Sequence, residues 1–358
     1  MSTSSSTAAT SGGNNMMYRF LGNTGLLVSQ LSFGSFVTFN TQLDFEKSYS
    51  VMERAFKRGV NFFDTAEAYA GGHSEEFMGK IIATGVERGV WTREDLVVST
   101  KIFFGTKHGG DQKAGPNEQG LSRKHVVEGT KASLKRLGLE YVDTIFCHRP
   151  DPCTPIEETV RAMNYVIKRG WAFYWGTSEW SAHDVIEACE IADRLGLVRP
   201  AFDQPQYHIL ERSRVELDYE TYGYGLTTWS PLAFGVLTGK YSKGIPEGSR
   251  LSMSSYMNYV ADSFEERVAK ADKLAAIAQE IGCTLAQLAI AWCVSNERVS
   301  TVILGASSVA QLDENLDALN FVNKLTPEVR AKIDVVANVS LRIPPPEARL
   351  LAMRTQWL

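Results

Sequence analysis

The sequence contains no apolar run that approaches the length of about eighteen residues needed to span a membrane as a helix. Residues 1–15 are mostly Ser, Thr, Gly, Ala and Asn, and they lack the apolar segment of a signal peptide. The five cysteines are scattered and form no C-x-x-C pair, so the sequence indicates neither a disulfide framework nor a zinc site. We therefore predict a reduced, cytoplasmic protein without membrane insertion or a bound metal, and a disordered tail at 1–15.

Clusters of one charge sign are also missing. The net charge is −4 over 358 residues, and no block of like charge stands out. This weak acidity argues against a nucleic-acid partner, although a local anion site is compatible with it. Apolar residues make up 44% and charged residues 22% of the chain, which is ordinary for a globular protein.

Eight short apolar runs alternate with helical patterns. The runs lie at 31–33, 60–63, 96–100, 142–147, 172–176, 202–204, 226–229 and 299–304, after a hairpin at 18–31. Helical patterns lie at 44–58, 74–83, 122–137, 155–169, 181–195, 264–281, 284–295 and 309–320, with a weaker one at 212–222. Alternation of this kind predicts a parallel sheet.

Eight strands are the number that closes a (β/α)8 TIM barrel, in which catalytic residues come from the C-terminal ends of several strands. The rival is a doubly wound open sheet, which would place G-x-G-x-x-G after its first strand, and the sequence has no such spacing. We predict an α/β barrel at 16–340 with a long insert at 232–263 after the seventh strand, followed by a tail at 341–358.

Polar residues stand where the second, third and fourth strands are expected to end. Asp64 follows the second run and Tyr69 lies in the loop after it, while Lys101 ends the third run and His148 follows the fourth. Each of these residues alone is more often a turn cap, a packing residue, a surface charge or a loop histidine. Together they suit protonation of a carbonyl oxygen, because an ammonium close to a phenol favours the phenolate and an aspartate keeps that lysine charged.

Reduction of a carbonyl requires a hydride, which no side chain supplies, so a cofactor is expected. Candidate anchors follow the seventh strand, lie in the insert, or precede the helix at 309–320. A helix N-terminus suits a phosphate, although the turn at 305–307 is equally compatible with an ordinary strand-to-helix connection. Residues 235–240 look like a P-loop but are one residue short, and Tyr241 stands where Ser or Thr is required, so we reject that interpretation.

At these residues the sequence resembles the aldo-keto reductase family. FFDTAEAY, Lys101, His148 and the late GASS-x-x-Q-x-x-EN follow the pattern of that family in order, over residues 17–335. GLSRKH, RPDPCTPIEETVRAM, FYWGTSEWS, TWSPLA-x-G and TLAQLAIAWC are similar to its branch of voltage-gated potassium channel β subunits and their plant and microbial relatives.

The resemblance implies an NADP(H)-dependent reductase of small aldehydes or ketones. Tyr69 would be the proton donor, Lys101 and Asp64 would tune it, and His148 would orient the substrate. Ser178 and Gln204 would contact the nicotinamide carboxamide, and Trp229 would lie beside the ring. Further contacts with NADPH or NADP+ are implied for Ser35, Phe36, Gln42, Asp64, Ser230, Pro231, Leu232, Gly235, Lys240, Arg250, Gly305, Ser307, Gln311, Glu314 and Asn315.

The same resemblance carries an alternative, a non-catalytic, cofactor-binding regulatory β subunit of a potassium channel. In either case the resemblance implies a homo-oligomer, and specifically a tetramer. Animal channel subunits carry Asn where this chain has His148, which favours the enzyme, and residues 1–15 have no basic or apolar cluster that could block a pore. Glu179 stands where those subunits carry Arg. His73 is expected at the surface or at the rim of the substrate site. The tail at 341–358 resembles no known segment.

Overall fold

The computed structural model describes residues 15–36, 43–108, 113–219, 224–257 and 260–357. Eight parallel strands close into a barrel in the order β10-β3-β4-β5-β6-β7-β8-β9, which confirms the predicted TIM barrel. The strands are β3 (Leu31–Gly34), β4 (Phe62–Asp64), β5 (Val97–Ile102), β6 (Val142–Cys147), β7 (Ala172–Thr177), β8 (Phe202–Asp203), β9 (Gly225–Thr228) and β10 (Val299–Leu304). Each predicted apolar run forms one of them, since strands buried on both faces read as continuous apolar stretches.

The hairpin at the start of the chain is formed by β1 (Tyr18–Phe20) and β2 (Leu27–Ser29), which pair antiparallel. Its Leu21 and Val28 pack with Phe62, Phe146 and other side chains of the barrel interior. Arg19 donates hydrogen bonds to three carbonyl groups between residues 294 and 299. The hairpin therefore closes the N-terminal end of the barrel, and the opposite end is left for a site.

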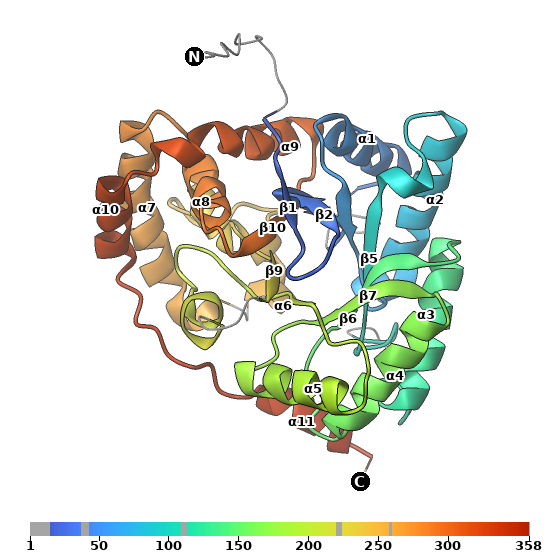
Figure 1. The fold of residues 1–358 in the computed structure, drawn as a ribbon. Helices are drawn as coiled ribbons and strands as arrows, with labels where there is room; N and C mark the ends of the chain where they lie inside the picture. The colour runs from blue at the N-terminus through green and yellow to red at the C-terminus, as the bar shows by residue number, and fades with distance from the viewer. Residues whose placement is uncertain (1–14, 37–42, 109–112, 220–223, 258–259, 358) are drawn as a thin grey trace, which may run out of the picture.

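Helices surround the strands, as Figure 1 shows. They are α1 (Phe45–Lys57), α2 (His73–Glu87), α3 (Arg123–Leu137), α4 (Ile156–Lys168), α5 (Ala182–Arg194), α6 (Ser254–Met257), α7 (Phe264–Glu280), α8 (Leu285–Val294), α9 (Val309–Leu316), α10 (Pro327–Ala337) and α11 (Ala348–Thr355). Several begin at a side-chain cap, because a Ser, Thr or Asp oxygen accepts an otherwise unpaired N–H of the first turn. Ser122 caps α3 and Ser181 caps α5 in this way.

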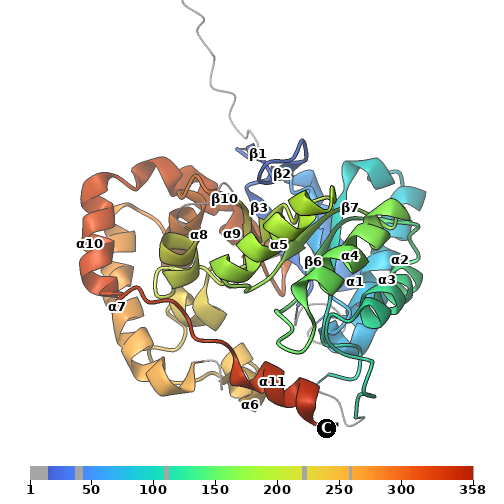
Figure 2. The same ribbon diagram turned by 60° about the horizontal axis from the view of Figure 1, so that its bottom comes forward.

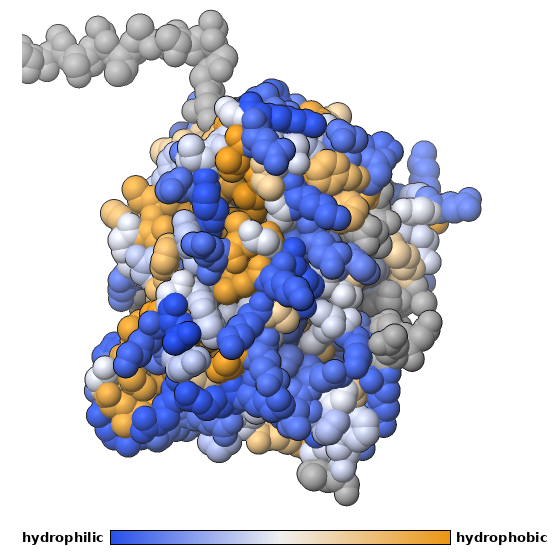
Figure 3. Space-filling view, turned by 90° about the vertical axis from the view of Figure 1, so that its right-hand side faces the viewer, coloured by the Kyte–Doolittle hydropathy of each residue, from blue (hydrophilic) through white to orange (hydrophobic). Residues whose placement is uncertain are grey.

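The outer helices are amphipathic. In α1, Tyr49, Met52 and Ala55 are buried against the barrel, while Lys47 and Lys57 are exposed. On the face that carries α2 and α3, hydrophilic residues accordingly surround smaller groups of hydrophobic ones (Figure 3). Among the described residues, no single helix is long and apolar enough to cross a membrane, and the pair α7 and α8 passes that test only jointly, across a bend of 84°.

The structure gives more detail for two of the predicted segments. The predicted helix at 212–222 is reduced to one π-helical turn, η3 (Arg214–Asp218), in which the Tyr219 N–H donates to the Arg214 carbonyl. Residues 220–223 lie outside the described part of the chain. The segment at 341–358, predicted as a tail, contains α11, and the chain after α10 runs across the molecule to reach it (Figure 2).

Candidate active site

The predicted Asp, Tyr, Lys and His meet at the C-terminal end of the barrel. Asp64 ends β4, Lys101 lies one residue before the end of β5, and His148 directly follows β6. These three strands are neighbours in the parallel barrel, so their C-terminal ends adjoin. Tyr69 begins η1 (Tyr69–Gly72), the 3-10 turn after β4, and its ring reaches back over the strand ends.

Lys101 connects two of these groups through one ammonium. Its Nζ donates to Asp64 Oδ2 at 2.5 Å, to the Thr65 carbonyl at 2.8 Å and to the Tyr69 phenol oxygen at 3.0 Å. The lysine side chain is completely buried, and burial lowers its pKa, which the Asp64 carboxylate opposes. Asp64 therefore favours the charged ammonium at the position where it contacts the phenol.

Asp64 is itself held by its second oxygen. Oδ1 accepts from Ser99 Oγ at 2.6 Å and from Gln204 Nε2 at 3.2 Å. Gln204 follows β8, so this contact spans the barrel interior. A carboxylate with this many donors is fixed in orientation, which in turn fixes the ammonium of Lys101.

The surroundings of His148 favour the neutral form of its imidazole. Burial lowers its pKa well below the ordinary value, and the charges of Arg149 and Lys101 lower it further. Its ring packs edge-on against Tyr69, with 5.7 Å between ring centroids, and against Phe104. Its Nδ1 is buried and has no hydrogen-bond partner among the residues that the structure describes. A neutral imidazole beside a phenol can donate a hydrogen bond to a carbonyl oxygen without adding charge.

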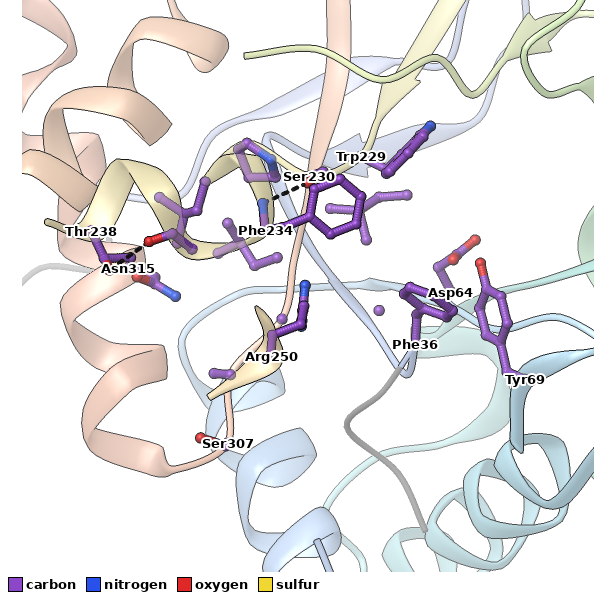
Figure 4. A pocket seen from close by; sticks show the side chains of 18 of the residues that line it. Phe36, Asp64, Tyr69, Trp229, Ser230, Phe234, Thr238, Arg250, Ser307 and Asn315 are labelled. Carbon is purple, nitrogen blue, oxygen red and sulfur yellow. Dashed lines mark hydrogen bonds between the residues drawn. The ribbon is translucent and has the colours of Figure 1, made fainter. Parts of the chain in front are cut away.

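A cavity of about 650 Å³ opens in front of these residues. Figure 4 shows it extending from Asp64 and Tyr69 at one end to Arg250, Ser307 and Asn315 at the other. We call these the reactive end and the phosphate end. The predicted cofactor contacts that line the cavity are Phe36, Asp64, Ser178, Gln204, Trp229, Ser230, Pro231, Leu232, Gly235, Lys240, Arg250, Gly305, Ser307, Gln311, Glu314 and Asn315.

Two basic side chains, Lys240 and Arg250, lie at the phosphate end of the cavity. Among the described residues, neither Lys240 nor Arg250 lies within ion-pair distance of a carboxylate. Gly235 has a φ of +93°, and a Cβ there would lie 2.8 Å from the Lys240 side chain, so glycine leaves room for that lysine. An extended cavity with free cations at one end fits a dinucleotide whose phosphates lie at that end.

Comparison with known proteins shows the family of the chain. The sequence model of the aldo/keto reductase family matches residues 30–338. The chain belongs to the aldo/keto reductase family. This membership supports oxidoreductase chemistry, and members of the family typically bind NAD(P)H.

Relatives at high identity carry a different kind of name. A "probable voltage-gated potassium channel subunit beta" of Arabidopsis thaliana is 55% identical over 327 residues, covering 90% of this chain and 96% of that protein. A protein of the same name from Oryza sativa subsp. japonica is 53% identical over 327 residues, covering 90% of this chain and 96% of that protein. A "putative voltage-gated potassium channel subunit beta" of Schizosaccharomyces pombe is 48% identical, over 90% of this chain and 94% of that protein.

Two of the predicted cofactor contacts are not placed in the cavity of this aldo/keto reductase. Ser35 is buried and does not line it, because its hydroxyl donates to the Asp64 carbonyl and accepts from Ser74 Oγ. Gln42 lies outside the described residues. His73 is exposed at the start of α2 with its Nδ1 3.0 Å from Glu76, and it is absent from the cavity wall.

Glu179 has a local role that the sequence did not reveal. Its Oε1 accepts from the Trp229 indole at 2.9 Å and from the Gln206 N–H at 2.6 Å. Its backbone has a φ of +59°, a conformation that L residues rarely adopt. Glu179 therefore fixes the orientation of Trp229, which lines the cavity between its two ends.

The cavity wall also includes residues that the sequence reasoning missed. Arg149 directly follows His148, so the rule that functional side chains follow barrel strands could have found it. Arg349, from the C-terminal segment, has no such signal. The other main additions are Phe104, His108, Phe234, Thr238, Ser249 and Thr284.

Proposed function

We propose that this aldo/keto reductase reduces aldehydes or ketones to alcohols with NADPH, with Tyr69 as the general acid. The observation that carries the proposal is the Lys101 ammonium, which contacts Asp64 and the Tyr69 oxygen at the wall of the cavity. When bound, NADPH would supply the hydride that adds to the carbonyl carbon. Phe36, 4.8 Å from the Tyr69 ring, and Trp229 would enclose the reacting groups and exclude water.

The residues at the reactive end have different roles in the proposed proton transfer. His148 holds the carbonyl oxygen by a hydrogen bond while the Tyr69 hydroxyl gives its proton to that oxygen. The phenolate left behind is stabilised by the hydrogen bond from the ammonium of Lys101. Because Asp64 balances the lysine charge, the ammonium remains available through the cycle, and solvent returns the proton to Tyr69 afterwards.

The remaining cofactor contacts are proposed from the wall of the cavity. Ser178 and Gln204 would meet the carboxamide of the nicotinamide. Lys240 and Arg250 would bind the phosphates, and Asn315 would meet the adenosine end. NADPH is preferred over NADH in this proposal, since an unpaired cation is available for the additional phosphate.

The relatives' names support a second candidate, a regulatory β subunit of a potassium channel that binds the cofactor without turning over substrate. Assembly as a tetramer and a cytoplasmic location belong to both candidates. A purified sample that oxidises NADPH with para-nitrobenzaldehyde supports the enzyme. A sample that quenches its tryptophan fluorescence on NADPH addition but oxidises none of it supports the regulatory subunit. Light scattering of the same sample measures the oligomeric state.

A further inference from the structure

Arg149 lies between two residues that have proposed roles in the reaction. It directly follows His148 after β6, and it lines the cavity although only 9% of its surface is exposed. Its Nη1 donates to the His148 carbonyl at 2.6 Å and to the Ser178 hydroxyl at 3.2 Å. Ser178 directly follows β7, the strand that pairs with β6. One guanidinium nitrogen therefore joins the ends of two neighbouring strands.

The hydrogen bonds continue from Ser178 to the residues that hold Asp64. Ser178 Oγ donates to the Gln204 carbonyl at 2.9 Å, and Gln204 Nε2 donates to Asp64 Oδ1 at 3.2 Å. A hydroxyl has one proton, and because Ser178 gives it to Gln204, its oxygen is left to accept from Arg149. The guanidinium and the Gln204 carbonyl together fix the position of this hydroxyl in the cavity wall.

The C-terminal segment holds Arg149 in place. Glu347 Oε1 lies 3.3 Å from the Arg149 Nε, in an ion pair that is mostly buried on the arginine side. Glu347 directly precedes α11, which is anchored by the buried Leu350 and by Arg354, 3.2 Å from the buried Asp151 carboxylate. Because partners surround both Nε and Nη1, the guanidinium is a fixed support for the groups that it contacts.

Arg149 also acts on His148 through its charge. Burial lowers the pKa of the imidazole, and the Arg149 guanidinium lowers that pKa further. The neutral form is the one that can hold a carbonyl oxygen by a hydrogen bond without adding charge. The same side chain therefore supports the backbone of His148 and favours the protonation state that its proposed role requires.

We propose that Arg149 is a positioning residue, which sets the carbonyl substrate against the nicotinamide through the His148 carbonyl and the Ser178 hydroxyl. The proposal rests on the reductase function argued above, in which His148 holds the carbonyl oxygen and Ser178 meets the carboxamide. These two residues follow different strands, so their relative position sets that of the two reactants. Hydride transfer depends steeply on this alignment, because a misplacement of about 1 Å can cost about a hundredfold in rate.

The kinetic test uses Arg149→Met in the 358-residue chain, which removes both hydrogen bonds and keeps an unbranched side chain. With NADPH and para-nitrobenzaldehyde, we expect the single-turnover rate, counted per bound NADPH, to fall by about ten- to a hundredfold. Arg149→Lys keeps a donor nitrogen on a shorter side chain and should recover part of this loss. It is also the test variant if Arg149→Met does not fold.

Arg93→Met is the matched control for a purely structural arginine. Arg93 donates to the Leu96 and Tyr141 carbonyls, and its side chain is 16% exposed, against 11% for Arg149. It is absent from the cavity wall. Arg93→Met should therefore unfold at a lower urea concentration and keep a single-turnover rate close to wild type. An Arg149→Met variant that behaves in the same way would overturn the proposal.

A binding measurement that needs no turnover separates this inference from the proposed function. Calorimetry gives the Kd for NADP+ of Arg149→Met, Ser178→Ala and the double variant, and each single change should weaken binding by about two- to tenfold, the value of one hydrogen bond. Because Arg149 acts through Ser178, the double variant should lose little more than the larger single loss, whereas independent contributions would multiply. A wild type that binds NADP+ but reduces no aldehyde would contradict the reductase function and leave this test intact. Multiplied losses, or an unchanged Kd in either single variant, would overturn the inference.

Discussion

The charged side chains at the two ends of the cavity differ in whether they have a partner of opposite charge. At the reactive end, Lys101 and Asp64 neutralise each other at 2.5 Å with almost no exposure to solvent. At the phosphate end, Lys240 and Arg250 face the cavity without a carboxylate partner among the described residues. Matched charges fix a hydrogen bond to Tyr69, while unmatched charges remain available for a ligand. The comparison supports the proposal that proton transfer takes place at one end and anion binding at the other.

The supports of the two ends differ as well. Asp64 and Lys101 lie on strands of the closed barrel, whereas Lys240 and Arg250 lie in the insert of 3-10 turns, η4 (Ala233–Thr238) and η5 (Arg250–Ser252), that follows β9. A site on strands is held more tightly than a site on loops. Substitutions at the reactive end should therefore affect stability and kcat, and those at the phosphate end should affect mainly cofactor affinity.

The largest effect is expected for Lys101→Met. The substitution leaves Asp64 buried without its counter-charge, so the free energy of unfolding should fall by about 3–5 kcal/mol, and NADPH oxidation should be lost. Urea unfolding followed by circular dichroism measures the first and the aldehyde assay the second. Lys107→Met, at a partly exposed pair with Glu118, is the control and should change stability by about 1 kcal/mol or less. Equal stability of the two variants would contradict the buried pair.

Tyr69→Phe removes the proton donor while keeping the ring. We expect kcat to fall by at least about a hundredfold, within the usual range for a general acid, with NADPH affinity nearly unchanged. Stopped-flow single turnovers and fluorescence titration measure the two quantities. Tyr141→Phe, on the outer surface against Phe173, should behave as wild type. A Tyr69→Phe variant with wild-type turnover would show that this residue is not the acid.

Arg250→Gln tests the role of the phosphate end in cofactor binding. We expect the Kd for NADPH to rise by about ten- to a hundredfold, because a charge-assisted hydrogen bond to a phosphate is worth about 1.5–3 kcal/mol, and kcat at saturating NADPH to stay close to wild type. Lys243→Gln, exposed in the same insert, is the control. Repeating the titration with NADH shows whether Arg250 contacts the additional phosphate of NADPH. If Arg250→Gln lowers kcat and leaves Kd unchanged, the assigned division between the ends is wrong.

The reactive end could be predicted from sequence more fully than the rest. Apolar runs of strand length located the eight strands, and Asp64, Lys101 and His148 followed because they stand at strand ends. Lys240 and Arg250 could be named only as candidate anchors in the insert, since the insert has no periodic pattern, and the family resemblance added their contact with the cofactor. Arg349 could not be predicted, because its place near Arg149 depends on the docking of Leu350 and Arg354 against distant loops. The weak helical pattern at 212–222 predicted a longer helix than the π-helical turn Arg214–Asp218 that the described residues form.

The smallest effect concerns pH and the neutral His148. Its pKa in the folded state lies well below the ordinary value, so below about pH 6.5 the unfolded chain binds a proton that the folded chain does not. Stability should therefore decrease as the pH falls, and His148 should account for about 1 kcal/mol between about pH 6.5 and pH 5.5. In His148→Asn the free energy of unfolding should change less steeply with pH, by the contribution of one titrating group. Urea unfolding at a series of pH values measures this dependence. His208→Asn provides the comparison, because His208 is equally buried but lies outside the cavity, and its pKa is also lowered by burial. Both variants should flatten the pH dependence of stability, and only His148→Asn should also reduce turnover. If His148→Asn leaves the slope unchanged, the imidazole is not held neutral at the reactive end.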